Sequence, residues 1–154
     1  MNQPSSSLET RPASKANRFV TSMLRSPLHI FMSGIMLITV TGRKSGRAIS
    51  TPVNYARDGD TLLVTSKADR TWWKNVRGGA KVTLLINGTP SQADANVIED
   101  RAAVERELQR FFRLVKRTIA GIHLDKDGQP TQPEKFAQVA QSRVIIEITY
   151  LTAQ

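Results

Sequence analysis

Residues 37–75 read LITVTGRKSGRAISTPVNYARDGDTLLVTSKADRTWWKN. Within and just before this stretch, runs rich in apolar and β-branched residues at 35–41, 48–57 and 61–66 each predict a strand. The Asp-Gly pair at 58–59 is a strong signal for a tight hairpin, because both residues tolerate a positive φ. We therefore expect the second and third strands to form an antiparallel hairpin with a fixed register.

The segment after the third strand predicts a short helix followed by a second hairpin. Asp69 is placed to cap this helix with its side chain, and the two glycines at 78–79 supply a left-handed stop. Further strands are predicted at 82–86 and 91–98, joined by Asn-Gly at 87–88, which is a type I′ turn signal. Two hairpins thus flank one short helix.

Helical periodicity dominates the rest of the chain. Residues 14–25 place apolar side chains at helical spacing among lysine and arginine, which predicts an amphipathic helix. A long amphipathic helix is predicted from Asp100 to a stop at Gly121, followed by a short helix at 134–141 and a last strand at 143–150. The apolar face of the long helix comprises Val104, Leu108, Phe111, Phe112, Val115 and Ile119.

These elements predict a mainly β, α+β fold: a six-stranded split antiparallel β-barrel with an N-terminal amphipathic helix and inserted helices. The strands lack the βαβ rhythm of a parallel sheet, and closure into a barrel removes exposed strand edges. Residues 1–13 are polar, with Pro4 and Pro12, and we expect them to be a disordered N-terminal tail. Residues 14–154 are expected to form a single domain, as the length of the chain suggests.

Composition limits the possible partners. The 22 Lys and Arg residues outnumber the 13 Asp and Glu residues, giving a formal net charge of +9 that favours anionic ligands. There is no cysteine, so the chain has no disulfide or thiolate nucleophile, as suits a cytoplasmic location. Two histidines and unclustered acidic residues predict no metal site. The longest apolar run, 28–40, is too short and interrupted to span a bilayer.

A basic, glycine-bounded turn follows the first strand, with the sequence TGRKSGR. Arg43, Lys44 and Ser45 offer two cations and a hydroxyl, and the backbone N–H groups near Gly42 and Gly46 could join them in holding a phosphate. The pattern is neither a Walker loop nor a dinucleotide-binding GxGxxG. From spacing alone, a solvated hairpin turn with ordinary surface charges is the preferred interpretation.

The strand end at Ser66 and Lys67 and the tryptophan pair are further candidates. Strand ends of a small barrel often border a ligand cleft, whereas a Ser-Lys catalytic pair is disfavoured because adjacent strand residues point to opposite faces. Trp72 and Trp73 are the only tryptophans. At least one should face the core, while the other could stack on a flat ligand; core packing of both is the competing interpretation.

The basic face of the long helix, residues 101–117, could bind nucleic acid or an acidic membrane. It lacks the interleaved aromatics of a single-strand binding groove, so a solvated helix face is the preferred interpretation. We therefore expect no nucleic-acid partner.

The order of motifs in this chain resembles that of the deazaflavin-dependent nitroreductase and quinone reductase family. The motifs are GRKSG, a proline eight residues after its lysine, the Asp-Gly hairpin, the strand ending in Ser-Lys, WWKN and AKVTLLI. The resemblance covers about residues 18–98 and, more loosely, the last strand. It implies a split β-barrel that binds coenzyme F420, an 8-hydroxy-5-deazaflavin with an anionic tail. It also implies hydride transfer to a quinone, nitroaromatic or enone-type acceptor.

The resemblance carries residue roles. Arg43, Lys44 and Ser45 are similar to residues that grip the phosphate region, and Pro52, Ser66 and Lys67 to residues that line the deazaflavin and its linker. Trp72, Trp73 and Asn75 match the aromatic pair near the ring and the asparagine that follows. As a hypothesis, Ser66 or Asn54 donates a hydrogen bond to the acceptor oxygen. The loop before the aromatic pair, residues 68–71, is shorter than in family members.

Other interpretations remain open at this stage. The same barrel could bind FMN or FAD, because a phosphate-binding turn does not distinguish these cofactors from F420. The apolar run 28–40 and the basic helix would also suit a non-catalytic lipid or cofactor carrier with peripheral membrane contact. The resemblance further implies a homodimer.

Overall fold

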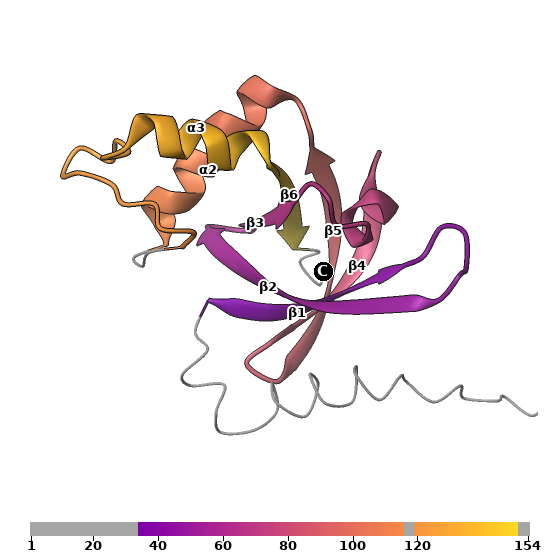
Figure 1. Cartoon of the computed structure of the whole chain (residues 1–154). Helices are drawn as coiled ribbons and strands as arrows, with labels where there is room; N and C mark the ends of the chain where they lie inside the picture. Colours follow the sequence, from indigo (N-terminus) through magenta and orange to yellow (C-terminus); the bar gives the residue numbers. More distant parts are fainter. Residues whose placement is uncertain (1–33, 116–118, 151–154) are drawn as a thin grey trace, which may run out of the picture.

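The computed structural model describes residues 34–115 and 119–150 (Figure 1). The expected helix at 14–25 and the expected tail at 1–13 lie outside these ranges. The elements are β1 (Ile35–Thr41), β2 (Ala48–Asp58), β3 (Thr61–Lys67), the 3₁₀ helix η2 (Trp72–Val76), β4 (Ala80–Ile86), β5 (Thr89–Ile98), α2 (Arg101–Leu114), α3 (Pro133–Gln141) and β6 (Arg143–Tyr150).

The six strands close into an antiparallel barrel in the order β1-β2-β3-β6-β5-β4. The predicted fold is therefore confirmed for the described residues, and strands 35–41 and 143–150 have the predicted bounds. Alternation fills the interior: on β3, for example, Leu62 and Val64 belong to the barrel core, whereas Leu63 faces outward.

Turn residues set the register of both hairpins. Asn87 and Gly88 both have positive φ, 49° and 78°, as a type I′ turn requires. In the other hairpin Asp58 pairs with Thr61, so Gly59 and Asp60 are the central residues. Gly59 has φ 60° and Asp60 is not in the positive-φ region, which is the pattern of a type II′ turn.

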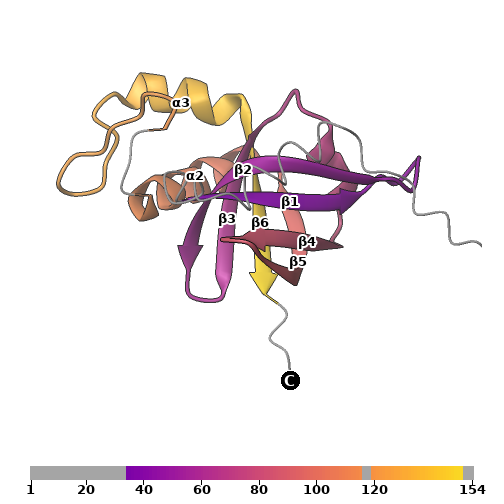
Figure 2. The same ribbon diagram turned by 90° about the horizontal axis from the view of Figure 1, so that it is seen from below.

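Two helices cover one outer face of the barrel. Helices α2 and α3 lie side by side over β2, β3 and β6, as the two views show (Figures 1 and 2). Their apolar faces bury a second core against Ala56, Leu63 and Ile145. Asp100 caps α2 by accepting a hydrogen bond of 3.0 Å from the N–H of Ala103. None of the helices in the described ranges is long and apolar enough to cross a membrane.

Two details of the predicted helices are wrong. The long helix ends at Leu114 rather than near Gly121, because the β-branched Val115 takes an extended conformation, with φ −83° and ψ 115°. Val115 and Ile119 still pack against the second core, so their burial does not need a continuous helix. Asp69 does not cap the short helix: the N-cap is Thr71, without a side-chain cap hydrogen bond.

Candidate functional site

One end of the barrel gathers the segments singled out in the sequence. In an antiparallel barrel of this order, the ends of β1 and β3 lie beside the starts of β2 and β6. The β1–β2 turn, residues 42–47, and η2 are therefore at the same end, which Figures 1 and 2 show on the right. We call this end, with its turn, η2 and adjoining strand ends, the site end.

The turn at 42–47 uses three of its six backbone N–H groups internally. The N–H of Gly42 donates to the Arg47 carbonyl and that of Gly46 to the Gly42 carbonyl, both at 2.8 Å. The N–H of Arg47 donates to Ser45 Oγ at 3.2 Å. The N–H groups of Gly42, Gly46 and Arg47 are therefore not available to a phosphate, and phosphate binding by the rest of this turn stays a prediction. Anion binding by this turn depends on the exposed side chains, chiefly that of Lys44.

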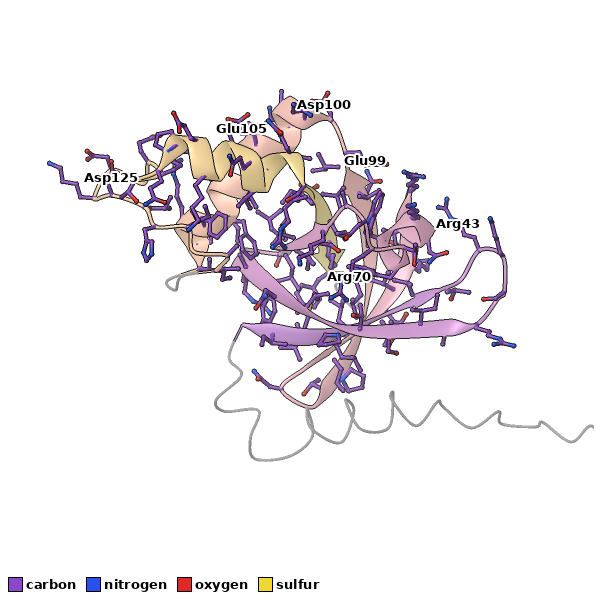
Figure 3. All side chains as sticks on the ribbon, viewed as in Figure 1. Arg43, Arg70, Glu99, Asp100, Glu105 and Asp125 are labelled. Carbon is purple, nitrogen blue, oxygen red and sulfur yellow. The ribbon has the colours of Figure 1, made fainter. Side chains whose placement is uncertain are left out.

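Asn75 connects the turn to η2. Its Oδ1 accepts a hydrogen bond of 3.0 Å from the N–H of Arg43, and its Nδ2 donates to the Trp72 carbonyl at 3.0 Å. The Arg43 guanidinium also donates to the Arg77 carbonyl. Asn75 thus positions the turn, which is a role the resemblance did not assign to it. Figure 3 labels Arg43 near this turn and Arg70, which is exposed, nearer the middle of the view.

Both tryptophans are buried, with exposed fractions of 7% for Trp72 and 3% for Trp73. They belong to the barrel core, so the interpretation that both pack inside is correct for the described structure. Two cations cover the Trp73 ring: Arg77 lies 5.0 Å and Lys74 5.9 Å from its centroid. Trp73 Nε1 is buried without a hydrogen-bond partner.

Glu99 holds Arg77 in place over this ring. Its two carboxylate oxygens accept hydrogen bonds of 2.9 and 2.8 Å from the guanidinium, a bidentate arrangement. These bonds lower the pKa of Glu99 and raise the pKa of Arg77 from their ordinary values. Both side chains are exposed, so the pair fixes Arg77 at the solvent-facing rim of the site end, which we call its mouth.

A gap opens where β2 and β3 separate. The two strands pair from Asp58 and Thr61 to Tyr55 and Val64, and no further. Beyond that point residues 51–54 remain paired with β1, and residues 65–67 remain paired with β6. We call this gap the β2–β3 split.

A cavity of about 150 Å³ lies in the β2–β3 split. Five residues predicted from the sequence line it together, namely Pro52, Asn54, Ser66, Lys67 and Trp72. Its other lining residues include Thr65, Arg70 and Arg143, which the sequence interpretation missed. The remaining predicted residues, Arg43, Lys44, Ser45, Trp73 and Asn75, lie at the same end of the barrel but do not line this cavity.

The cavity brings cations together without compensating acids. Lys67 and Arg143 are direct cross-strand partners on β3 and β6. Burial, and secondarily the charge of Arg70, lower the pKa of Arg143. No acidic side chain in the described ranges forms a salt bridge with Lys67, Arg70 or Arg143. Like charges directly opposite on adjacent strands are destabilising, so this arrangement suits an anionic ligand.

The two proposed donors, Ser66 and Asn54, lie on different strands and differ in burial. Ser66 follows Leu62 and Val64 on the inward side of β3, is 6% exposed, and its Oγ donates to the Lys67 carbonyl at 3.3 Å. Asn54 lies on β2, opposite Ile35, and is half-buried. Elsewhere in the described ranges, no group of three or more acidic or histidine side chains comes together as metal ligands would.

Comparison with known proteins identifies the family of this chain. A sequence model of the F420H(2)-dependent quinone reductase family matches residues 15–128. No curated protein matches the sequence.

Three solved structures illustrate the likeness in fold. A conserved hypothetical protein from Mycobacterium tuberculosis has a TM-score of 0.51 and 17% identity, over 91% of this chain and 82% of its own. The FAD and haem binding protein from Mycobacterium smegmatis has a TM-score of 0.50 and 10% identity, over 86% of this chain and 65% of its own. An F420 reductase has a TM-score of 0.46 and 14% identity, over 85% and 92%. At such identities the first two structures show a likeness in fold alone.

Proposed function

Because this chain belongs to the F420H(2)-dependent quinone reductase family, we propose that it binds reduced coenzyme F420 at the site end and delivers hydride to a quinone. The family is one of F420-dependent oxidoreductases, so the class of reaction and the cofactor follow from membership. The proposal concerns which residues bind the cofactor, which assist the reaction, and which acceptor is reduced.

The observation that supports the location is the unpaired positive charge around the β2–β3 split. Lys67, Arg70 and Arg143 line one cavity and have no salt bridge with an acid of the described ranges. A cofactor with a phosphate and carboxylates in its tail supplies the missing negative charge. The side chains present therefore fit F420. FMN has a phosphate too, so the same charge is consistent with it.

The size of the cavity limits which part of the cofactor it can hold. Pockets that enclose a whole drug-sized ligand are typically about 300–1,000 Å³, whereas this cavity is about 150 Å³. The cavity could therefore enclose only part of the cofactor, and the rest would lie outside it, toward the β1–β2 turn. In this placement Arg43, Lys44 and Ser45 contact the anionic tail through their side chains.

The bound cofactor supplies the hydride, and the protein supplies binding, orientation and a polar environment for the acceptor. Trp72 and Trp73 close the barrel below the site with buried aromatic surface, which excludes water from that side. Asn75 keeps the β1–β2 turn against η2. Ser66 or Asn54 donates to the acceptor oxygen as negative charge develops on it; for Ser66 this requires its hydroxyl to rotate away from the Lys67 carbonyl.

A homodimer and a cytoplasmic location are the other parts of the proposal, and gel filtration tests the first.

The fold weakens the argument for peripheral membrane contact. Within the apolar run, residues from Ile35 onward form β1, and Met36, Ile38 and Val40 are barrel core. The apolar character of this part of the run is explained by folding.

Fluorescence titration of the purified protein with F420 and, separately, with FMN tests the cofactor. We expect saturable F420 binding; micromolar FMN affinity with no F420 binding would contradict the proposal. Turnover with reduced F420 and menadione then tests the acceptor. We expect Ser66→Ala to slow hydride transfer at saturating cofactor by about 10²–10³-fold, as for loss of one oxyanion donor. An unchanged rate would remove Ser66 from the donor role and leave Asn54→Ala as the next variant.

A further inference from the structure

The β2–β3 split contains three polar side chains that neither the sequence motifs nor the family resemblance assigned. Arg70 follows β3, Arg143 begins β6, and Thr65 lies on β3 two residues before Lys67. All three line the 150 Å³ cavity. Folding brings them together although Arg143 is far from the others in sequence.

The positive charges that line the cavity repel one another, although Lys67 and Arg70 are exposed to solvent. Lys67 and Arg143 face each other across β3 and β6, which places like charges in a direct cross-strand pair. Arg70 adds a third positive charge close enough to affect the titration of Arg143. In contrast, Arg110 on α2 has two carboxylate partners, Asp58 and Glu107. A bound anion would relieve the repulsion in the cavity.

Thr65 gives an independent indication of a ligand. It is 8% exposed, and its Oγ1 is buried without a hydrogen-bond partner in the described structure. Buried polar atoms are nearly always hydrogen-bonded, so an unsatisfied hydroxyl in a polar cavity needs a reason. An oxyanion beside Arg70 and Arg143 would accept a hydrogen bond from this hydroxyl.

The cavity is better suited to a small anion than the β1–β2 turn is. The turn at 42–47 uses the N–H groups of Gly42, Gly46 and Arg47 for its own closure. The cavity, in contrast, combines a partly enclosed volume, cations without acid partners and a free hydroxyl. Its volume admits a phosphate or carboxylate group but not a tricyclic ring.

We propose that Thr65, Arg70 and Arg143 form an oxyanion subsite in the β2–β3 split, which binds a phosphate or carboxylate group. The group belongs either to the tail of the bound cofactor or to a free anion such as inorganic phosphate. The anion lies between the two guanidinium groups and accepts a hydrogen bond from Thr65 Oγ1. The subsite does not depend on which redox cofactor the protein uses.

Thermal unfolding with inorganic phosphate tests the subsite directly, with sodium chloride at matched ionic strength as the reference. We expect phosphate to raise the Tm of the wild type. Arg143→Gln should weaken phosphate binding roughly ten- to hundred-fold, the usual range for loss of a charge-assisted hydrogen bond. Arg110→Gln removes the same charge from the helix-covered side and should leave the phosphate response unchanged. ³¹P NMR line broadening of phosphate gives a second readout.

Thr65→Val is a second variant that nearly preserves shape and removes only the hydroxyl. We expect it to fold at least as stably as the wild type without phosphate, because it removes an unsatisfied buried group. It should also show a smaller phosphate response. If phosphate does not stabilise the wild type, or stabilises wild type, Arg143→Gln and Arg110→Gln equally, the subsite is refuted.

Two further titrations identify the source of the anion. If the cofactor tail fills the subsite, Arg143→Gln weakens binding of F420 more than binding of the tail-less deazaflavin nucleoside, and phosphate competes with F420. If a free anion fills it, phosphate and F420 bind together and Arg143→Gln leaves F420 affinity unchanged. A wild type that binds no deazaflavin would refute the proposed function, while the phosphate titration would still decide the subsite.

Discussion

The helix-covered side of the barrel and the site end differ in how far their polar side chains have hydrogen-bond and ion-pair partners. On the helix-covered side, Arg110 pairs with Asp58 and Glu107, and Gln109 donates to the Gly128 carbonyl and to Gln129 Oε1 at 3.3 and 3.0 Å. These contacts connect α2 to the β2–β3 hairpin and to the loop before α3. The side chains named here are satisfied by the fold itself.

At the site end, Arg77 and Glu99 are paired, but other polar groups lack such partners. In the described ranges, the two buried side-chain polar atoms without a hydrogen bond are Thr65 Oγ1 and Trp73 Nε1, and both lie there. The like-charged pair Lys67 and Arg143 is there too. Native proteins leave few buried polar groups unsatisfied. The difference indicates that the helix-covered side is arranged for stability and the site end for a ligand.

The largest predicted effect is a loss of stability when Trp73 is replaced. Trp73→Ala removes a 3% exposed aromatic side chain from the barrel core and should lower the free energy of unfolding by about 3–5 kcal/mol. Trp73→Phe should cost clearly less, because it keeps most of the apolar surface and removes an N–H that has no partner. Urea denaturation monitored by circular dichroism measures both changes.

This pair of variants can break the comparison. If Trp73→Phe destabilises the protein as much as Trp73→Ala, the indole N–H contributes a favourable interaction, and the site end is better satisfied than the structure indicates. Phe111→Ala in the second core is the matched control, because Phe111 is fully buried on the helix-covered side. It should also cost about 3–5 kcal/mol.

A smaller effect is expected at the ion pair on the helix-covered side. Asp58→Asn removes one carboxylate partner of Arg110 and should cost about 0.2–1 kcal/mol, since both side chains are partly exposed. It should not alter F420 affinity. Titration calorimetry with F420 and urea denaturation measure the two quantities on the same preparation. A marked loss of F420 affinity would show that this side also takes part in binding.

Local sequence signals predicted most of the barrel. Alternating apolar residues and the Asn87-Gly88 turn depend on neighbouring residues only, which is why the strands and the register of that hairpin were correct. The end of α2 was wrong because the apolar spacing continues to Ile119 beyond the helix. Periodicity reports burial, and Val115 and Ile119 are partly buried although neither belongs to the helix.

The site was predictable only in part, for a physical reason. Pro52, Ser66 and Lys67 lie within one hairpin, so a family motif could link them. Arg143 reaches the cavity because β6 pairs with β3, which depends on the strand order of the closed barrel. The order β3-β6 joins strands that are distant in sequence, and local patterns do not contain it. The sequence hinted at this pairing only through the predicted positions of Lys67 near the end of one strand and Arg143 at the start of another.

The smallest predicted effect concerns Glu99 and depends on pH. Arg77 lowers the pKa of Glu99 below its ordinary value of about 4.5 in the folded protein. The folded state thus disfavours protonation of Glu99, so the stabilisation is fully present above about pH 4.5. It is lost as the pH falls through the lowered pKa. Glu99→Gln should therefore lower Tm slightly at pH 7.

The difference in Tm between wild type and Glu99→Gln should shrink below about pH 4.5 and vanish at lower pH. Thermal scans between pH 7 and pH 3 at low salt measure this, and added salt should reduce the difference at pH 7 because the pair is exposed. A difference that stays constant over the whole pH range would mean that Glu99 acts through packing rather than charge. The charge of Arg77 over Trp73 would then not be stabilised by the Glu99 carboxylate. In that respect Arg77 would resemble the cations of the cavity, which have no carboxylate partner.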